Sequence, residues 1–133
     1  MTPTTKKRIL LAEDDASIRK TTKFRLEHEG YEVVAAEDGA EVLKLADVTI
    51  HLVLLDINLP KMDGYEVCRR LKQNQVTAKI PVLIFSASEN QLRHLANRCI
   101  EVGAVDWLAK PFRTVQLMEK IHHALGEGES AHG

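Results

Sequence analysis

Short apolar runs alternate with longer polar and amphipathic stretches along the chain. Five of these runs are predicted to form strands: residues 9–12, 31–35, 52–55, 82–85 and 104–108. The first, third and fourth runs are almost continuously apolar, which is typical of parallel strands that are buried on both faces. The second run mixes polar with apolar residues and therefore suits the edge of a sheet.

Between the runs, apolar residues recur at helical spacing. Two stretches repeat them every four positions: Ile18, Thr22 and Leu26 in the first helix, and Leu117, Ile121 and Leu125 in the last. Gly30 is expected to close the first helix, because glycine readily adopts the left-handed conformation found there. Strands that alternate with helices through short loops predict an α/β fold, in which helices cover both faces of a parallel sheet.

The helix after the third run is expected to have a buried side and a solvated side. Cys68 fits the buried side, whereas Arg69, Arg70 and Lys72 are expected to lie in water. Cys68 and Cys99 are far apart in the sequence and lack the spacing of metal ligands. Both are therefore interpreted as reduced, structural thiols of a cytoplasmic protein.

The bulk composition indicates one globular domain. A chain of 133 residues, of which 44% are hydrophobic, is long enough for a single buried core. The net charge of −1 gives no basic surface for direct binding to nucleic acid. No apolar run approaches the ~18 residues of a membrane span, and no signal peptide is recognisable. We expect residues 7–125 to form the domain and residues 126–133 a disordered polar tail, which is either a natural end or a truncated linker.

Chemically active side chains follow four of the predicted strands. Glu13 and Asp14 follow the first run, Asp56 the third, Ser86 the fourth and Lys110 the fifth. Because the carboxyl ends of parallel strands meet at one edge of the sheet, where such folds bind ligands, these groups are expected to converge. Three acids, one hydroxyl and one ammonium are a coherent set for handling a phosphoryl group.

The acids point to a hard metal ion. Clustered carboxylates repel one another unless a cation or protons intervene. Mg²⁺ takes one or two carboxylates together with water and phosphate oxygens. Asp14 and Asp56 can supply the carboxylates, Glu13 can hold a metal-bound water, and a backbone carbonyl from the Asn58 loop can complete the shell. Mn²⁺ is the alternative ion.

Asp56 is the candidate reactive group. A carboxylate can act as a nucleophile and form an aspartyl-phosphate. Lys110 would neutralise the charge of the phosphoryl group, and the Ser86 hydroxyl would donate a hydrogen bond to one of its oxygens. The structural alternative for Glu13 and Asp14 is capping of the first helix, but the adjacent Asp15 is better placed for that.

Four motifs in order resemble the receiver domain of two-component response regulators. They are Ile-Leu-Leu-Ala-Glu-Asp-Asp at 9–15, Leu-Leu-Asp-Ile-Asn-Leu-Pro-Lys-Met-Asp-Gly at 54–64, Phe-Ser-Ala at 85–87 and Lys-Pro-Phe at 110–112. The resemblance covers about residues 7–125. Each motif alone is modest evidence for the family, whereas all four in order form a specific signal. It implies a doubly wound, flavodoxin-like fold with a five-stranded parallel sheet in the order 2-1-3-4-5.

The resemblance also implies roles for individual residues. Asp56 would be phosphorylated by a phosphohistidine donor. Mg²⁺ would bind at Glu13, Asp14, Asp56 and the backbone carbonyl of Asn58. Three further residues would couple phosphorylation to a change of shape: Ser86, Lys110 and the aromatic Trp107.

The chain departs from the family pattern at three places. Ser86 replaces the commoner threonine and so lacks the methyl group that restricts the side-chain rotamer. Trp107 replaces the usual tyrosine or phenylalanine with a larger ring. The stretch 88–102 is about two residues longer than the usual spacing, which changes the fourth helix or the loop before it.

The leading hypothesis is a phosphoacceptor switch that acts through protein contacts. It would catalyse its own phosphorylation and dephosphorylation and would have no separate substrate, so it is not an enzyme in the usual sense. The expected partners are a histidine kinase or histidine phosphotransfer protein and an unknown downstream protein, with no nucleic acid or membrane. The chain would be a monomer or a phosphorylation-dependent dimer.

Three alternatives stay open or are disfavoured. The chain can be the receiver part of a larger hybrid kinase or transcription regulator. It can be a receiver-like scaffold that is not phosphorylated, although a scaffold needs neither the acids nor Lys110. A flavodoxin-like cofactor carrier is disfavoured, since the acidic loop 13–15 would repel an anionic cofactor.

Overall fold

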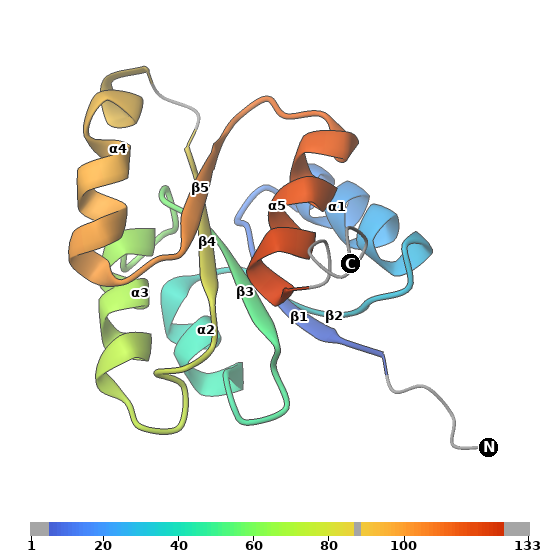
Figure 1. Ribbon diagram of the computed structural model, residues 1–133, viewed down its shortest axis with the longest axis horizontal. Helices are drawn as coiled ribbons and strands as arrows, with labels where there is room; N and C mark the ends of the chain where they lie inside the picture. The colour runs from blue at the N-terminus through green and yellow to red at the C-terminus, as the bar shows by residue number, and fades with distance from the viewer. Residues whose placement is uncertain (1–5, 87–88, 127–133) are drawn as a thin grey trace.

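The computed structural model describes residues 6–86 and 89–126, and within these ranges strands alternate strictly with helices (Figure 1). The strands are β1 (Arg8–Ala12), β2 (Glu32–Ala36), β3 (Leu52–Asp56), β4 (Val82–Ser86) and β5 (Asp106–Ala109). The helices are α1 (Ala16–His28), α2 (Gly39–Leu45), α3 (Gly64–Gln73), α4 (Glu89–Val102) and α5 (Thr114–Leu125). Among the described residues, no helix has the length and apolar character needed to span a membrane.

The strands form one parallel sheet in the order β2-β1-β3-β4-β5, which confirms the expected fold class and strand order. Every residue of β3 and β4 is buried, as the continuous apolar runs predict. The register places Asp56 opposite Phe85 and Ser86 opposite Ala109. The last residues of three neighbouring strands therefore lie at one edge of the sheet.

Helices cover both faces of the sheet, and each face has its own core. Helices α2, α3 and α4 pack on one face, and α1 and α5 pack on the other (Figure 1). The first core includes Val42, Val67, Leu71 and Val102 from the helices, and the second includes Leu26, Leu117 and Ile121. Burial of these helical stripes fixes the sheet in place, so the loops at its edge stand on a rigid base.

Three helices begin with a capping aspartate directly after the loop at the carboxyl edge. Asp15, Asp38 and Asp63 each accept the main-chain N–H of the residue three positions further on, at 3.0, 2.8 and 2.9 Å. Each cap satisfies a donor that a helix start would otherwise leave unpaired. The capping role predicted for Asp15 is confirmed, and these caps define the loops that surround the strand ends.

Two strands start later than the apolar runs predict. β2 begins at Glu32, and the preceding Tyr31 N–H donates to the Leu26 carbonyl in the last turn of α1. β5 begins at Asp106, and the Ala104 N–H before it donates to the Cys99 carbonyl of α4. In both cases the residue at the start of the apolar run closes the preceding helix, and the next N–H, that of Glu32 or Val105, is the first to bond to the neighbouring strand or its extension.

The four-residue repeat lies on a helix, as its spacing predicts, but only part of the repeat is buried. Thr22 and Leu26 are buried, but Ile18 is 40% exposed. Together with Pro111 and Phe112 it lines a surface hollow of about 550 Å³ between α1 and the loop before α5. Ile18, in the first turn of α1, therefore faces this hollow.

The solvated face predicted for the third helix is wrong at Lys72. Arg69 and Arg70 are exposed as expected, but Lys72 is half-buried. Its Nζ donates to the carbonyl oxygens of Ala78, at 3.0 Å, and Ile80, at 2.6 Å. Burial lowers the pKa of Lys72. This lysine therefore ties α3 to the loop that leads into β4.

Both cysteines are free thiols inside the protein, so the burial predicted for Cys68 is confirmed. The Cys68 Sγ donates to the Val102 carbonyl at 3.4 Å, across the contact between α3 and α4. Burial raises the pKa of Cys68 to about 12 and that of Cys99 to about 11. At neutral pH neither forms the reactive thiolate, as expected for structural thiols.

Candidate functional site

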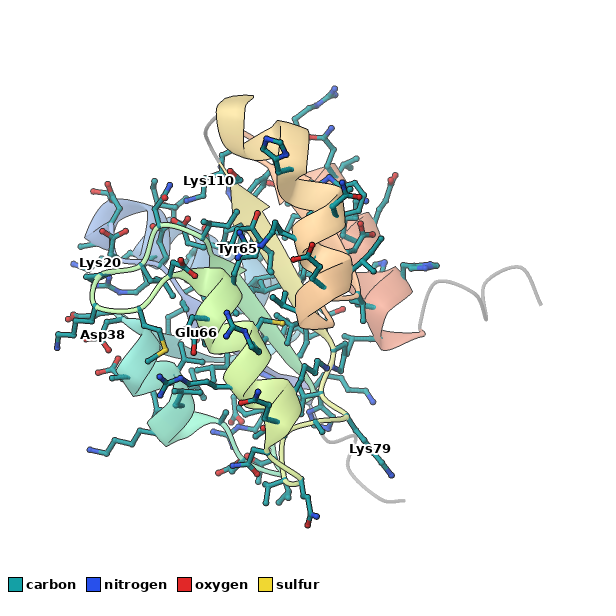
Figure 2. All side chains as sticks on the ribbon, turned by 90° about the vertical axis from the view of Figure 1, so that its left-hand side faces the viewer. Lys20, Asp38, Tyr65, Glu66, Lys79 and Lys110 are labelled. Carbon is teal, nitrogen blue, oxygen red and sulfur yellow. The ribbon has the colours of Figure 1, made fainter. Side chains whose placement is uncertain are left out.

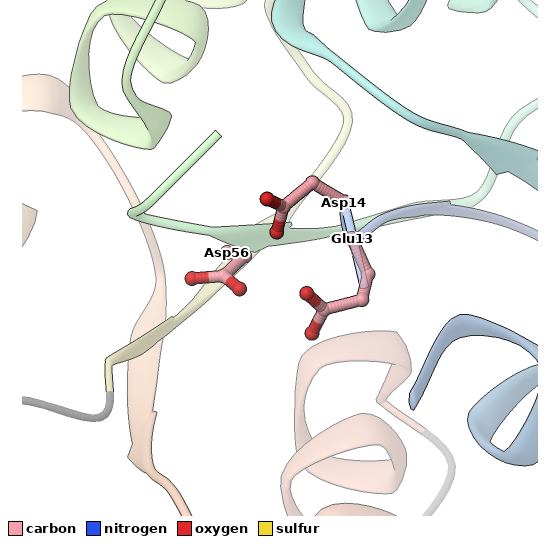
Figure 3. A group of neighbouring side chains, drawn as sticks. All are labelled: Glu13, Asp14 and Asp56. Atoms are coloured by element: carbon pink, nitrogen blue, oxygen red, sulfur yellow. The ribbon is translucent and has the colours of Figure 1, made fainter. Parts of the chain in front are cut away.

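Three acidic side chains from two strands converge at the carboxyl edge of the sheet. Glu13 and Asp14 follow β1, and Asp56 is the last residue of β3 (Figure 3). One carboxylate oxygen from each lies within 4.8 Å of those of the other two. The structure thus brings together the acids that the sequence places more than 40 positions apart.

The three acids differ in exposure. Glu13 is 1% exposed and Asp56 is 3% exposed, whereas Asp14 faces solvent. Burial raises the pKa of Glu13, because an ionised carboxylate loses its hydration and lies beside the Asp56 carboxylate. The cluster is therefore a buried pair of acids with a third acid at its open side.

Lys110 supplies the compensating charge. Its Nζ lies 2.5 Å from Glu13 Oε1 and 2.7 Å from Asp56 Oδ2, and its side chain is only 14% exposed. Burial alone would lower the pKa of Lys110, but hydrogen bonds and charges from Asp56 and Glu13 outweigh it and raise that pKa. In Figure 2, Lys110 lies at one end of the sheet and Lys79 at the opposite end. Lys110 is thus held as an ammonium ion at the acidic edge.

The donor set fits a hard divalent cation. Three carboxylates share the one ammonium group of Lys110, so negative charge remains at the cluster. Carboxylate oxygens are the ligands that Mg²⁺ and Mn²⁺ prefer, and both ions keep part of their water shell. The exposed Asp14 leaves one side of the cluster open to solvent. Glu13, Asp14 and Asp56 can therefore hold the predicted ion.

The loop after β3 keeps its main chain close to Asp56. The Asn58 N–H donates to Asp56 Oδ1 at 3.0 Å, while Oδ2 accepts from Lys110. This places the main chain of Asn58, the residue predicted to offer its carbonyl to a metal ion, beside the carboxylate. At Gly64 a Cβ atom would lie 2.6 Å from the Asp56 carbonyl oxygen, so only glycine allows this approach. The Asp56 carboxylate is consequently fixed from both oxygens.

The other two predicted residues occupy β4 and β5. Ser86 is fully buried, and its carbonyl accepts the Lys110 N–H at 2.7 Å, which links the two strand ends. Trp107 is 37% exposed on β5, with Lys120 Nζ 5.9 Å from its ring centroid. Ser86 thus belongs to the edge of the sheet that carries the acids. The coupling of Trp107 to that edge stays a prediction, and residues 87 and 88 lie outside the described residues.

One contact at this edge was not predicted from the sequence. Arg19, in the second turn of α1, donates from Nη1 to the main-chain oxygens of Glu13, at 2.8 Å, and Asp14, at 3.3 Å. The sequence feature that could have indicated this contact is an arginine shortly after an acidic pair. That signal is weak, since an arginine on an amphipathic helix usually faces water.

Comparison with known sequences identifies the family of this domain. The model of the response regulator receiver domain matches residues 9–122. The alkaline phosphatase synthesis transcriptional regulatory protein PhoP of Bacillus subtilis is 35% identical over 126 residues. That match covers 94% of this chain and 51% of PhoP. The chain therefore spans about half the length of the curated relatives that it matches.

Solved structures agree. The chemotaxis response regulator CheY4 of Vibrio cholerae has a TM-score of 0.81 and 28% identity, covering 91% of this chain and 100% of its own. The receiver domain of a sensor histidine kinase from Pseudomonas aeruginosa has a TM-score of 0.80 and 26% identity. It covers 92% of this chain and 99% of its own, and holds a magnesium ion in its active site cleft. With fold, sequence and acidic edge in agreement, this chain belongs to the response regulator receiver domain family.

Proposed function

We propose that this chain is a phosphoacceptor switch in which Asp56 accepts a phosphoryl group in a Mg²⁺-dependent reaction. The donor is a phosphohistidine of a histidine kinase or histidine phosphotransfer protein. One observation carries the proposal: Lys110 Nζ bonds to the carboxylates of both Asp56 and Glu13, with Asp14 beside them. A reactive carboxylate, a cation and further acids at a strand end form a site for phosphoryl transfer.

The transfer step uses the fixed Asp56 carboxylate as nucleophile. One of its oxygens attacks the phosphorus atom while the bond from phosphorus to the imidazole nitrogen breaks, and the nitrogen keeps the electron pair. The Asn58 N–H and Lys110 hold the carboxylate in one orientation, which lowers the entropic cost of the attack. Lys110 and the Ser86 hydroxyl then stabilise the charge on the phosphoryl oxygens.

The acids beside Asp56 prepare the site for this charge. Glu13 and Asp14, with Asp56 and the Asn58 carbonyl, would hold the divalent cation. When bound, Mg²⁺ neutralises the carboxylates and takes up charge from the phosphoryl oxygens. Without it, the anionic edge would repel an incoming phosphoryl group, so we expect no transfer when the cation is removed.

The switch also resets itself. Water attacks the phosphorus of the aspartyl-phosphate, inorganic phosphate leaves, and the Asp56 carboxylate is restored. The chain therefore catalyses its own phosphorylation and dephosphorylation without a separate substrate. The phosphorylated state pulls Ser86 inward and changes the position of Trp107, and a downstream protein senses the altered surface of α4, β5 and α5.

A second candidate is that this domain is the receiver part of a longer transcription regulator. The observation in favour is that the chain covers only about half of PhoP, with 51% of that protein matched. An immunoblot of the native cells separates the two: a band near 14.9 kDa, the mass of this chain, favours a free switch. A band about twice as heavy favours the longer regulator.

Intact-mass spectrometry after incubation with acetyl phosphate tests the proposal. We expect the wild-type chain to gain one phosphoryl group with Mg²⁺ and none after chelation. Asp56→Asn should gain none, because an amide is a poor nucleophile. Asp47→Asn, in the loop at the opposite end of the sheet, is the matched control and should behave as wild type. A phosphoryl group on Asp56→Asn would contradict the proposal.

A further inference from the structure

Arg19 connects three elements around the acidic edge. It lies in α1, and its Nη1 donates to the carbonyl oxygens of Glu13, at 2.8 Å, and Asp14, at 3.3 Å. Its Nη2 pairs with Glu37 Oε1, in the loop between β2 and α2, at 3.4 Å. The Arg19 side chain is only 15% exposed. One guanidinium group therefore holds the main chain of both acids of the cluster against α1.

We propose that Arg19 is a positioning residue for the divalent-cation site. It fixes the main chain at Glu13 and Asp14 so that both carboxylates point toward Asp56. The inference rests on the proposed function, because it assigns Arg19 to the cation site of that function. Arg19 touches neither the reacting carboxylate nor a phosphoryl group, so its action passes through the two acids.

The atoms that Arg19 contacts support a positioning role for this residue. The two Arg19 bonds to the acidic pair go to main-chain oxygens, while the carboxylates of Glu13 and Asp14 lie within 4.8 Å of that of Asp56. A rotation of the main chain between the two acids would move both carboxylates at once. The planar guanidinium holds these oxygens through Nη1 and Glu37 through Nη2, and the single ammonium of lysine cannot span both sets of partners in the same way.

Glu37 completes the arrangement from the other side. Its carboxylate is 69% exposed, so the ion pair with Arg19 contributes little to stability. Its position, however, sets the direction of the guanidinium plane, because Nη2 faces Glu37 while Nη1 faces the acidic pair. We therefore expect Glu37→Gln to have the same effect as a change at Arg19, but a smaller one.

The sign of the effect separates positioning from simple charge. Arg19 is a cation near a cation site, so electrostatic repulsion alone predicts that its removal strengthens Mg²⁺ binding. Loss of positioning predicts the opposite, since residues that orient metal ligands typically contribute about tenfold or more to affinity. The direction of the change is thus informative in itself.

Calorimetric titration with Mg²⁺ alone provides the test. We expect Arg19→Gln to bind Mg²⁺ roughly tenfold more weakly than wild type. Arg19→Lys should fall between the two, because it keeps the charge but loses the fork. Lys20→Gln removes one positive charge from the next position of α1, where the structure shows no ion pair among the described residues, and should not weaken binding (Figure 2).

Three results would overturn the inference. The first is an Arg19→Gln protein that binds Mg²⁺ as tightly as wild type or more tightly. If circular dichroism shows that Arg19→Gln does not fold, Arg19→Lys is compared with wild type instead. An Arg19→Lys protein that binds Mg²⁺ with wild-type affinity is the second such result. The third is a wild-type chain that binds no Mg²⁺, which removes the cation site itself. Only this last result counts against the proposed function as well.

Discussion

Two lysines in this domain make similar contacts with opposite consequences. Lys110 and Lys72 are both partly buried, and the Nζ of each donates to two oxygen atoms. The partners of Lys110 are the carboxylates of Glu13 and Asp56, whereas those of Lys72 are main-chain carbonyls. The pKa of Lys110 is raised and that of Lys72 is lowered.

The difference follows from the charge of the partners. Burial removes water from both ammonium groups and disfavours their charged form. The carboxylates around Lys110 more than offset this loss, whereas the carbonyl dipoles of Ala78 and Ile80, in the loop before β4, do not. Lys72 therefore serves as a structural tie between α3 and the next loop. Lys110 belongs to a site with surplus negative charge, where it can also neutralise an incoming anion.

The largest expected difference between Lys110 and Lys72 is their effect on the rate of phosphorylation. We expect Lys110→Met to slow phosphorylation by acetyl phosphate about 100-fold or more, since it removes a preorganised charge from the phosphoryl group. Lys72→Met should keep the wild-type rate, as should the exposed control Lys79→Met at the opposite end of the sheet (Figure 2). Time courses by intact mass measure all three rates. Equal losses in Lys110→Met and Lys72→Met would erase the distinction.

The two lysines should also differ in whether their contribution to stability depends on Mg²⁺. We expect Lys72→Met to lower the free energy of unfolding by about 2 kcal/mol, because it removes a charged donor from two partly buried carbonyls. This loss should be the same with and without Mg²⁺. Lys110→Met should lose stability mainly without Mg²⁺, since a bound cation can replace the ammonium charge among the carboxylates. Urea unfolding measures both, and a Mg²⁺-dependent loss in Lys72→Met would be inconsistent with its structural role.

The contributions of Lys72 and Lys110 to the free energy of unfolding should change with pH in opposite directions. The pKa of Lys72 is below its ordinary value of 10.5, so the folded protein binds fewer protons and this group adds stability as the pH rises toward 10.5. The pKa of Lys110 is above 10.5, so its contribution is complete below that value and declines above it. Differences in unfolding free energy between wild type and each methionine variant, across the alkaline range, measure these slopes. Slopes of equal sign would show that the carboxylates do not dominate at Lys110.

The smallest effect is expected for exposed charges on α3, the helix that carries Lys72. Glu66 pairs with Arg69 at 2.8 Å and Arg70 at 2.9 Å, and both arginines are more than half exposed. We expect Glu66→Gln to change the free energy of unfolding by at most about 0.5 kcal/mol. A loss as large as that of Lys72→Met would mean that burial is not what distinguishes the two sites.

The sequence predicts the acidic edge well for a simple reason. Apolar runs locate the buried strands, and parallel strands must place their carboxyl ends at one edge. The convergence of Glu13, Asp14, Asp56 and Lys110 needs no further information. The strand order does need further information, because alternating strands and helices can be arranged in several orders. Here the family resemblance implies the order.

The contacts of long side chains could not be predicted. Helical spacing places Lys72 beside Arg69, and nothing in that spacing shows that the loop after α3 turns back to cover only Lys72. Arg19 likewise looks like a solvated helix residue until the path of the loop after β1 is known. Such contacts depend on where loops run in space, which periodicity does not encode.

The central claim is that Asp56 carries the phosphoryl group. Borohydride reduces an aspartyl-phosphate to homoserine, so reduction of the phosphorylated chain followed by peptide mapping identifies the modified residue. We predict homoserine at position 56 alone, and none when Mg²⁺ is chelated before acetyl phosphate is added. Homoserine at any other aspartate, with position 56 unchanged, would contradict the account.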